Sequence, residues 1–387
     1  MFAVDIQDQI LDKLNTLIVV LNNDGSIDYV SKSAQQLLGY NSRDLIGNNW
    51  WEMTRFSKPE GELVKHKILQ AFKNNQHSTQ TFEHELRTSA GGRKWVNWNV
   101  SYLNDEQLIG VGYDITDKKS NEKKLIDSNK QLLEKNKDIT DSIYYAQRIQ
   151  QSILQTEEQL TACFSESFLI YKPKDIVSGD YYWFYETEQF RYISVVDCTG
   201  HGVPGAMMSM VANSIFKEVF INKHITDPGK ILKELDKELE KAINRHSDDS
   251  FSDGMDVSLI RIDKASHELV FAGAFRSVII TRHAEIIELK GSRYPIGFYS
   301  GIEKEFENTS FTLQTEDCIY LYTDGFIDQF GGEKNKKLNK LNFKDLLRTI
   351  YDMNMEEQEA FLDYSFNNWK QDNDQTDDVL VIGIRIT

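Results

Sequence analysis

Aspartates stand at the ends of several apolar, strand-like segments in the C-terminal part of the chain. Asp180 opens DYYWFYE, Asp197 closes ISVVD, Asp324 closes IYLYTD, and Asp377 and Asp378 precede VLVIGI. A strand end fixes a side chain at the rim of a sheet, so several rims that meet would form a pocket of carboxylates. Carboxylates at short range repel one another, and Mg²⁺ or Mn²⁺, which prefer oxygen ligands, remove that repulsion.

Each of these aspartates taken alone has an ordinary structural explanation. Asp324 stands before Gly325, and an Asp-Gly pair after a strand most often forms a plain turn. An acid ahead of a glycine-rich loop is often a cap. The conjunction of several strand ends, and not any single aspartate, therefore indicates metal chemistry.

The segment 159–387 resembles the PPM (protein phosphatase 2C-like) phosphatases of the SpoIIE-type bacterial branch. The resemblance is carried by SGDYYW, VVDCTGHGVPGAMMS, YLYTDGFIDQF and QTDDVLVIGIRI. It implies an α-β-β-α sandwich and two divalent cations, Mn²⁺ or Mg²⁺, about 3.5–4 Å apart, with a bridging hydroxide that attacks a phosphoserine or phosphothreonine. No phospho-enzyme is implied, so no nucleophilic cysteine is expected.

The resemblance also implies roles for individual residues. Asp197 would bridge the two metals, and the backbone carbonyl of Cys198 would be a second contact. Asp180 and Asp324 would be further ligands, together with Asp377. Asp378 is the alternative to Asp377, because the sequence does not say which of the two points inward.

Two further residues are additional candidates, and the segment departs from the family pattern at two points. Asp256 lies on a strand near the expected site, and we expect it to face solvent. His201 is displaced by two loop residues from the proton donor proposed for eukaryotic relatives. Leu380 stands where a Ser or Thr is often found, and the only candidates for a phosphate-binding arginine are Arg276 and Arg293.

Two other functions fit parts of the same sequence. Residues 200–205 match G-x-G-x-x-G after a strand and before a helix, the fingerprint of a dinucleotide-binding oxidoreductase. Asp197 argues against this function, because it would place a negative charge beside the pyrophosphate. The other alternative is a non-catalytic scaffold with the phosphatase fold, against which the full acidic set argues.

The elements that would position these residues alternate along residues 159–387. We expect helices over 204–220, 227–246, 342–351 and 355–369. We expect strands over 181–186, 190–197, 256–263, 268–275, 277–282, 318–324 and 379–386.

Residues 1–118 are typical of a small α+β domain with short strands and tight turns. A helix is expected to end near Leu14, and a hairpin turns at Asn23-Asp24-Gly25. The hairpin, AQQLLGY, DLIG, GGRKWVNW and GVGYDITDKK make this segment resemble a PAS sensor domain, whose ligand the sequence does not identify. His66, His77 and His84 are haem ligands in principle, but a lone histidine is more often a surface or packing residue.

Residues 119–158 contain no proline or glycine and predict a long helix. Leucine, isoleucine or alanine recurs every seventh residue at 125, 132, 139, 146 and 153, with Asn129, Asn136, Ile143 and Gln150 at the a positions. This pattern predicts a parallel homodimer through a coiled coil. The alternative is a helix packed on its own domain through Ile126, Leu133 and Leu154.

The composition limits which classes of partner and which cell compartment are expected for this chain. The net charge of −16 argues against a nucleic-acid partner, because phosphate binding needs a basic patch. Three widely spaced cysteines fit neither a zinc site nor a disulfide framework, and the N-terminus lacks a basic signal sequence, so we expect a cytoplasmic protein without direct membrane insertion. The resemblance implies a phosphoprotein partner of the anti-sigma-factor antagonist type.

Overall fold

The computed structural model describes residues 16–74, 79–243, 253–297 and 303–387. The chain divides into an N-terminal compact unit that ends at Asn136 and a C-terminal compact unit that begins at Lys137. Within the part of the chain described here, no helix combines the length and the apolar character that a membrane crossing requires. The expected helix end near Leu14 lies outside the described residues.

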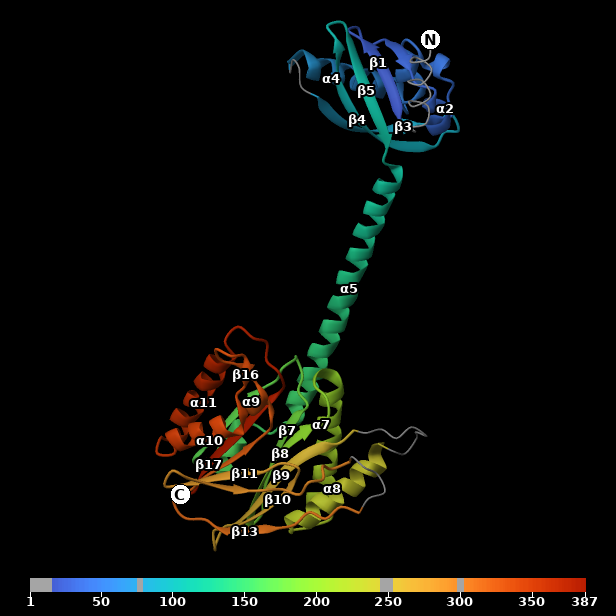
Figure 1. Ribbon diagram of the computed structural model, residues 1–387. Coiled ribbons are helices and arrows are strands. Elements are labelled where there is room, and N and C mark those ends of the chain that lie inside the picture. Colours follow the sequence, from blue (N-terminus) through green and yellow to red (C-terminus); the bar gives the residue numbers. More distant parts are fainter. Residues whose placement is uncertain (1–15, 75–78, 244–252, 298–302) are drawn as a thin grey trace. The chain divides into compact units, whose positions relative to one another are not determined.

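The N-terminal unit contains one antiparallel sheet of five strands in the order β2-β1-β5-β4-β3 (Figure 1). The expected hairpin is confirmed, because β1 and β2 pair antiparallel and Gly25 adopts φ +79° in the turn, a conformation that glycine permits. The strands are β1 (Leu17–Asn22), β2 (Ile27–Val30), β3 (Gln80–Arg87), β4 (Arg93–Asn104) and β5 (Gln107–Asp114).

Four helical segments follow β2 and pack on this sheet through one hydrophobic core. Leu17, Trp50, Ile68 and Trp98 are among its buried members. Each such side chain, moved out of water, stabilises the fold by roughly 1.5–3 kcal/mol. The segments are α2 (Ser33–Leu38), the 3₁₀ helix η1 (Ser42–Leu45), α3 (Asn49–Met53) and α4 (Lys58–Asn74).

The C-terminal unit is built on two stacked antiparallel sheets of five strands each. One has the order β13-β10-β9-β8-β7 and the other the order β12-β11-β14-β17-β6. Their strands are β6 (Ser167–Lys172), β7 (Asp180–Glu186), β8 (Phe190–Cys198), β9 (Met255–Asp263), β10 (Glu268–Ala274), β11 (Val278–Arg282), β12 (Glu285–Leu289), β13 (Thr309–Thr312), β14 (Cys318–Tyr322) and β17 (Val379–Arg385). A small ribbon is formed by β15 (Phe330–Gly331) and β16 (Lys336–Lys337).

Helices cover the outer face of each sheet, which gives the expected α-β-β-α sandwich (Figure 1). One core lies between the sheets, with Ile193 and Ile260 facing Ile319 and Ile382. The helices on the first sheet are α7 (Gly202–Lys217), the π-helical turn η2 (Glu218–Asn222) and α8 (Pro228–Ile243). Those on the second sheet are α9 (Gly325–Asp328), α10 (Asn339–Ile350) and α11 (Met355–Lys370).

The expected long helix is present as α5 (Thr116–Ile153), and a separate helix, α6 (Glu157–Cys163), follows it. The helix therefore ends at Ile153, before residue 158, and Thr156 begins the next helix with a capping box to Gln159. Ile126 and Leu133 are 66% and 70% exposed, so the alternative in which they pack on their own domain is wrong for these two residues.

The dinucleotide-binding alternative is also wrong. That function requires a strand, a helix and a parallel strand in succession. Here β8 pairs antiparallel with both β7 and β9, and the helices that follow the glycine-rich loop lead into β9.

Candidate metal-dependent phosphatase site

Three aspartates form a row across the first sheet at the end that carries the glycine-rich loop. Asp180 on β7 lies directly opposite Asp197 on β8, and Asp197 lies directly opposite Asp256 on β9. Like charges that face each other across strands are destabilising, so this row requires a compensating positive charge. The alternation of side chains along β9 turns Asp256 into the pocket, and the expectation that it faces solvent is wrong: only 18% of its side chain is exposed.

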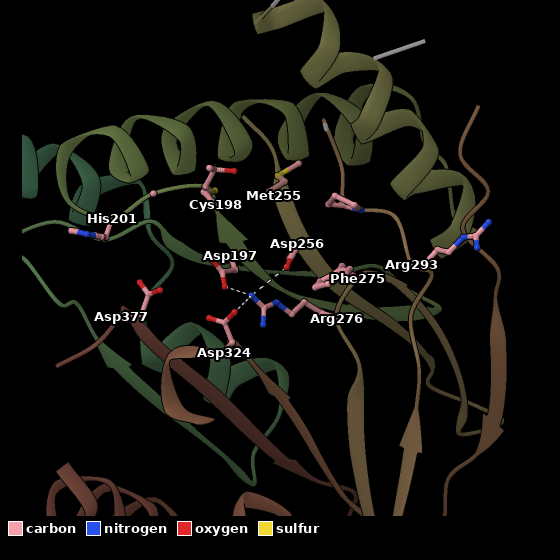
Figure 2. A pocket seen from close by; sticks show the side chains of 13 residues that line it. Asp197, Cys198, His201, Met255, Asp256, Phe275, Arg276, Arg293, Asp324 and Asp377 are labelled. Atoms are coloured by element: carbon pink, nitrogen blue, oxygen red, sulfur yellow. Dashed lines mark hydrogen bonds and ion pairs between the residues drawn. The ribbon is translucent and has the colours of Figure 1, made fainter. Parts of the chain in front are cut away.

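The second sheet supplies two more carboxylates to the same place. Asp324 follows β14 and Asp377 precedes β17, and these two strands are neighbours. Asp324 and Asp377 line a pocket of about 420 Å³ together with Asp197 and Asp256 (Figure 2). The strand ends of both sheets thus converge, as the sequence predicted.

The adjacent pair Asp377 and Asp378 has divided roles. Asp377 lines the pocket. Asp378 is buried and accepts hydrogen bonds from the backbone N–H groups of Lys174 and Gly179, at 2.7 Å each. Successive residues in an extended segment point to opposite sides, so only one of the two faces the pocket.

Close backbone contacts fix the loops that carry the aspartates. A Cβ atom on Gly205 would lie 2.2 Å from the carbonyl oxygen of Gly200, and one on Gly325 would lie 1.8 Å from the carbonyl oxygen of Asp378. Neither position accepts a side chain without moving backbone. Gly205 of the fingerprint-like loop therefore serves tight packing beside the carboxylates.

Arg276 provides the positive charge at the centre of the pocket (Figure 2). Its Nη2 donates to Asp197 and to Asp324, the latter at 2.9 Å, and lies 3.3 Å from a carboxylate oxygen of Asp256. Only 12% of its side chain is exposed. Burial works against the charge of the guanidinium, but the three carboxylates outweigh it and raise the pKa of Arg276.

Burial acts on the carboxylates in the opposite direction. It raises the pKa of Asp197 to about 8 and that of Asp256 to about 6, although Arg276 lowers both. Burial, followed by the charge of Asp197, raises the pKa of Asp180 well above its usual range. Burial therefore disfavours the simultaneous ionisation of these acids.

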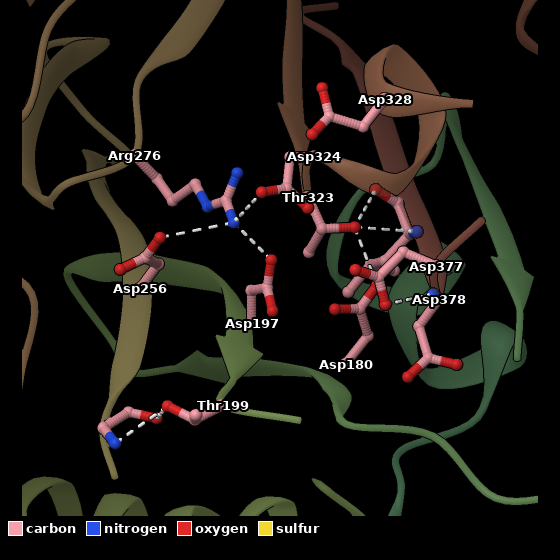
Figure 3. A network of polar contacts seen from close by, with 12 residues as sticks. Asp180, Asp197, Thr199, Asp256, Arg276, Thr323, Asp324, Asp328, Asp377 and Asp378 are labelled. Carbon is pink, nitrogen blue, oxygen red and sulfur yellow. Dashed lines mark hydrogen bonds and ion pairs between the residues drawn. The ribbon is translucent and has the colours of Figure 1, made fainter. Parts of the chain in front are cut away.

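Asp180 is buried, does not line the pocket and is held by a residue that the sequence analysis missed. The hydroxyl of Thr323 donates to a carboxylate oxygen of Asp180 at 2.7 Å (Figure 3). The backbone N–H of Thr323 donates to the carbonyl of Leu380, and the backbone N–H of Leu380 donates to the hydroxyl of Thr323, so this hydroxyl lies beside the position where a Ser or Thr was expected. The only signal in the sequence was its place next to Asp324.

The family-model comparison adds sequence evidence to this geometry. The model of Stage II sporulation protein E (SpoIIE) matches residues 191–387, about half of the chain. The chain belongs to the SpoIIE family. A PAS domain model matches residues 15–117, so this SpoIIE-family chain carries a PAS domain ahead of its PP2C-like phosphatase domain.

The C-terminal unit shares its fold with a solved PP2C domain, and a second solved structure is similar in sequence to a lower degree. The SiaA-PP2C domain of Pseudomonas aeruginosa is 34% identical over 65% of this chain and 98% of that one, with a TM-score of 0.60. The PP2C phosphatase domain of SpoIIE from Bacillus subtilis, with a fragment of its regulatory domain, is 19% identical over 57% of this chain and 62% of that one, with a TM-score of 0.47. Among curated protein sequences, none matches this chain.

The remaining candidate residues from the sequence analysis occupy less central positions. The side chain of Cys198 is buried in the core under α7, and burial raises the pKa of its thiol well above its usual range, as suits a residue that is not a nucleophile. His201 borders the pocket, with Nδ1 2.7 Å from Asp175 and Nε2 3.2 Å from Lys174. Arg293 also lines the pocket and donates to the hydroxyl of Tyr294 at 3.0 Å.

The donor set fits a divalent cation by its chemistry. Carboxylate oxygens are the ligands that Mg²⁺ and Mn²⁺ prefer, and the guanidinium of Arg276 already stands where a positive charge is needed. As they stand, no three acidic, histidine or cysteine side chains of the described residues are grouped closely enough to hold a metal ion. Arg276 contacts three of the acids, so its guanidinium supplies the positive charge among them.

Proposed function

We propose that this protein is a sensor-regulated, metal-dependent protein serine/threonine phosphatase that uses two divalent cations, Mn²⁺ or Mg²⁺. The supporting observation is the convergence of strand-end aspartates from both sheets on one pocket. A non-catalytic scaffold would gain nothing from buried like charges, which destabilise the fold unless they are compensated.

The carboxylates of Asp180, Asp197, Asp256, Asp324 and Asp377 would hold the cations, with Asp197 at the centre of the row. The backbone carbonyl of Cys198 remains a proposed contact. When bound, two divalent cations activate a water for attack on phosphorus and neutralise the phosphoryl oxygens.

The chain's own residues orient this set and position the substrate. Thr323 holds one oxygen of Asp180 and thereby fixes the direction of the other. Arg276, once it leaves the carboxylates, would contact the phosphoryl group from the wall of the same pocket. Both ring nitrogens of His201 already have partners, so we do not assign it as the proton donor.

The C-terminal part of α5 supports regulation through the linker helix. Gln150 is buried and donates to the carbonyl of Ser178 at 2.6 Å and to the hydroxyl of Ser209 at 2.9 Å. It also accepts from the backbone N–H of Ser178 at 3.2 Å, two residues before Asp180. We propose that a shift of α5 moves the segment that carries Asp180 and so changes metal occupancy. Gln150 therefore belongs to this docking contact and not to the coiled-coil seam.

The dimer and the substrate are further parts of the proposal. Every seventh residue along part of α5 is an exposed apolar side chain: Leu125 is 62%, Leu132 57% and Ile139 58% exposed. An unpaired coiled-coil seam would be exposed in this way. We propose that two chains pair there and that the substrate is a phosphoprotein of the anti-sigma-factor antagonist type. The proposed domain boundaries are those given from the sequence, with segments 1–118, 119–158 and 159–387.

The test is hydrolysis of a phosphoserine peptide by the full chain with and without Mn²⁺. Asp197→Asn should lower the Mn²⁺-dependent rate by roughly 10²–10³-fold, the usual cost of one group that stabilises charge at a reacting centre. Asp175→Asn, outside the carboxylate row, is the control and should keep most of the rate. A wild-type protein that hydrolyses nothing with Mn²⁺ or Mg²⁺ would favour the scaffold.

A further inference from the structure

An aromatic side chain lies exposed at the edge of the pocket that the carboxylates line. Phe275 lines this pocket, precedes Arg276 in the chain and is 62% exposed (Figure 2). Single exposed apolar side chains are common on protein surfaces and by themselves require no explanation. What sets Phe275 apart is the conformation of its backbone.

The backbone of Phe275 forms a tight three-residue turn. Its φ is +64°, and the N–H of Arg276 donates to the carbonyl of Ala274 at 2.8 Å across the turn. A γ-turn with positive φ is the rare, strained kind, which a Cβ atom makes costly and which glycine would adopt freely. Among the non-glycine residues with positive φ in the described part of the chain, only Phe275 lines the pocket.

The turn and the exposed ring are both unfavourable to the fold at this one residue. Strained backbone conformations persist where the surrounding structure holds them, and they cluster at functional sites. Here the N–H of Phe275 donates to the carbonyl of Ser292 at 2.8 Å, which holds the turn against the neighbouring segment. The ring itself gains little from folding, because most of its surface stays in water. A glycine would fit this backbone better, which indicates that the ring contacts a molecule that enters the pocket.

The surface next to Phe275 has room for a peptide chain and not only for a phosphate group. A second pocket of about 400 Å³, lined by Tyr294 and Glu305 among others, adjoins the first at Arg293, which lines both. Arg293 is exposed, with its guanidinium 5.1 Å from the centre of the Tyr294 ring. An extended chain advances by about 3.3 Å per residue, so the neighbours of a phosphoserine bound in the first pocket would pass over its rim.

We propose that Phe275 is a specificity-determining residue, which binds a large apolar side chain of the substrate within about two residues of the phosphoserine or phosphothreonine. This contact rests on the proposed phosphatase function and adds to it the class of side chain that is recognised. Burial of two apolar surfaces against each other is favourable, whereas a small polar side chain gains nothing from the ring. Because Phe275 lies apart from the reacting atoms, it strengthens the binding of the peptide and not the chemical step.

The test is steady-state hydrolysis of synthetic phosphoserine peptides by the full chain with Mn²⁺. A single leucine is placed in turn at the nearest positions before and after the phosphoserine of a serine- and glycine-based peptide, and the leucine-free peptide is the reference. The wild-type chain should prefer at least one leucine peptide by about tenfold in kcat/KM, mainly through a lower KM. Phe275→Gly should reduce this preference to about twofold or less. Tyr364→Ala, which removes an exposed ring from α11, should keep it.

A second variant and the thermal stability exclude a purely structural role of the ring. Phe275→Asn should lose the preference as well, because asparagine tolerates positive φ and offers no apolar surface. The ratio between two peptides on one variant cancels any general loss of activity. Both variants should have a Tm at least as high as the wild type, since the strain is relieved. A Tm lowered by about 4 °C or more in both would mean that the ring serves the fold, and would overturn the proposal.

Hydrolysis of a small ester, para-nitrophenyl phosphate, separates the role of Phe275 from the phosphatase function. A wild-type chain that hydrolyses the ester but shows no preference among the peptides would overturn the role of Phe275 and leave the phosphatase function intact. A preference that Phe275→Gly and Phe275→Asn both lose supports the two together. A chain that hydrolyses neither the ester nor any peptide would overturn both.

Discussion

Replacement of Arg276 by methionine tests whether the guanidinium occupies the position where the cations would bind and competes with them for the carboxylates. The substitution keeps an unbranched side chain of related length but leaves Asp197, Asp256 and Asp324 without a cation. Removal of one partner from a buried ion cluster costs about 3–5 kcal/mol. We expect the lower end, about 3 kcal/mol, because Asp197, with a pKa of about 8, takes up a proton readily.

The expected result has opposite signs for stability and for metal affinity. Without divalent ions the C-terminal unit should lose roughly 6–12 °C in Tm, at about 2–4 °C per kcal/mol for a unit of this size. Saturating Mn²⁺ should remove that difference, because the cations replace the lost charge. Since the guanidinium no longer competes for the carboxylates, Mn²⁺ should bind between about tenfold and 100-fold more tightly.

The assay is thermal unfolding and calorimetric Mn²⁺ titration of the full chain after treatment with a chelator. Arg293→Met is the matched control, because Arg293 lines the same pocket but donates only to Tyr294, and it should change neither quantity. Weaker Mn²⁺ binding by Arg276→Met would refute the reasoning, since it would mean that the arginine helps to build the metal site. An unchanged Tm of the metal-free protein would refute it as well.

Two further predictions concern α5. Gln150→Leu leaves buried backbone groups near Asp180 without hydrogen-bond partners, so we expect a loss of about 1–3 kcal/mol in unfolding free energy and weaker Mn²⁺ binding. Denaturant unfolding and Mn²⁺ titration measure these two quantities. Gln151→Leu, at an exposed neighbouring position, should change neither, and equal behaviour of the two variants would contradict the coupling. Leu132→Glu should convert the dimer to a monomer, as measured by sedimentation equilibrium. Glu134→Gln, on the outward side of the helix, should leave the dimer intact. A wild-type chain that is monomeric at all concentrations would exclude the coiled coil.

Several of the pocket's carboxylates could be predicted from the sequence because the ends of strands can be predicted from it. An apolar run that stops at an acid places the acid at a sheet rim, and Asp197 and Asp324 lie there as predicted. The same reasoning could not choose between Asp377 and Asp378, because the choice depends on which face of β17 is turned to the pocket. It also misplaced Asp256, because the pairing of β9 with β8 decides which face of β9 is turned to the pocket.

The residues that sequence reasoning could not place act across large separations in the chain. Arg276 reaches Asp197 and Asp324 from a loop after β10, and Gln150 reaches Ser178 from a helix whose seven-residue repeat had placed it in the coiled-coil seam. No local periodicity encodes such contacts, since only the stacking of the sheets and the docking of α5 bring these groups together. Both residues contact the carboxylate row or the segment leading into it, so the groups best placed to switch the site are the ones that only the fold discloses.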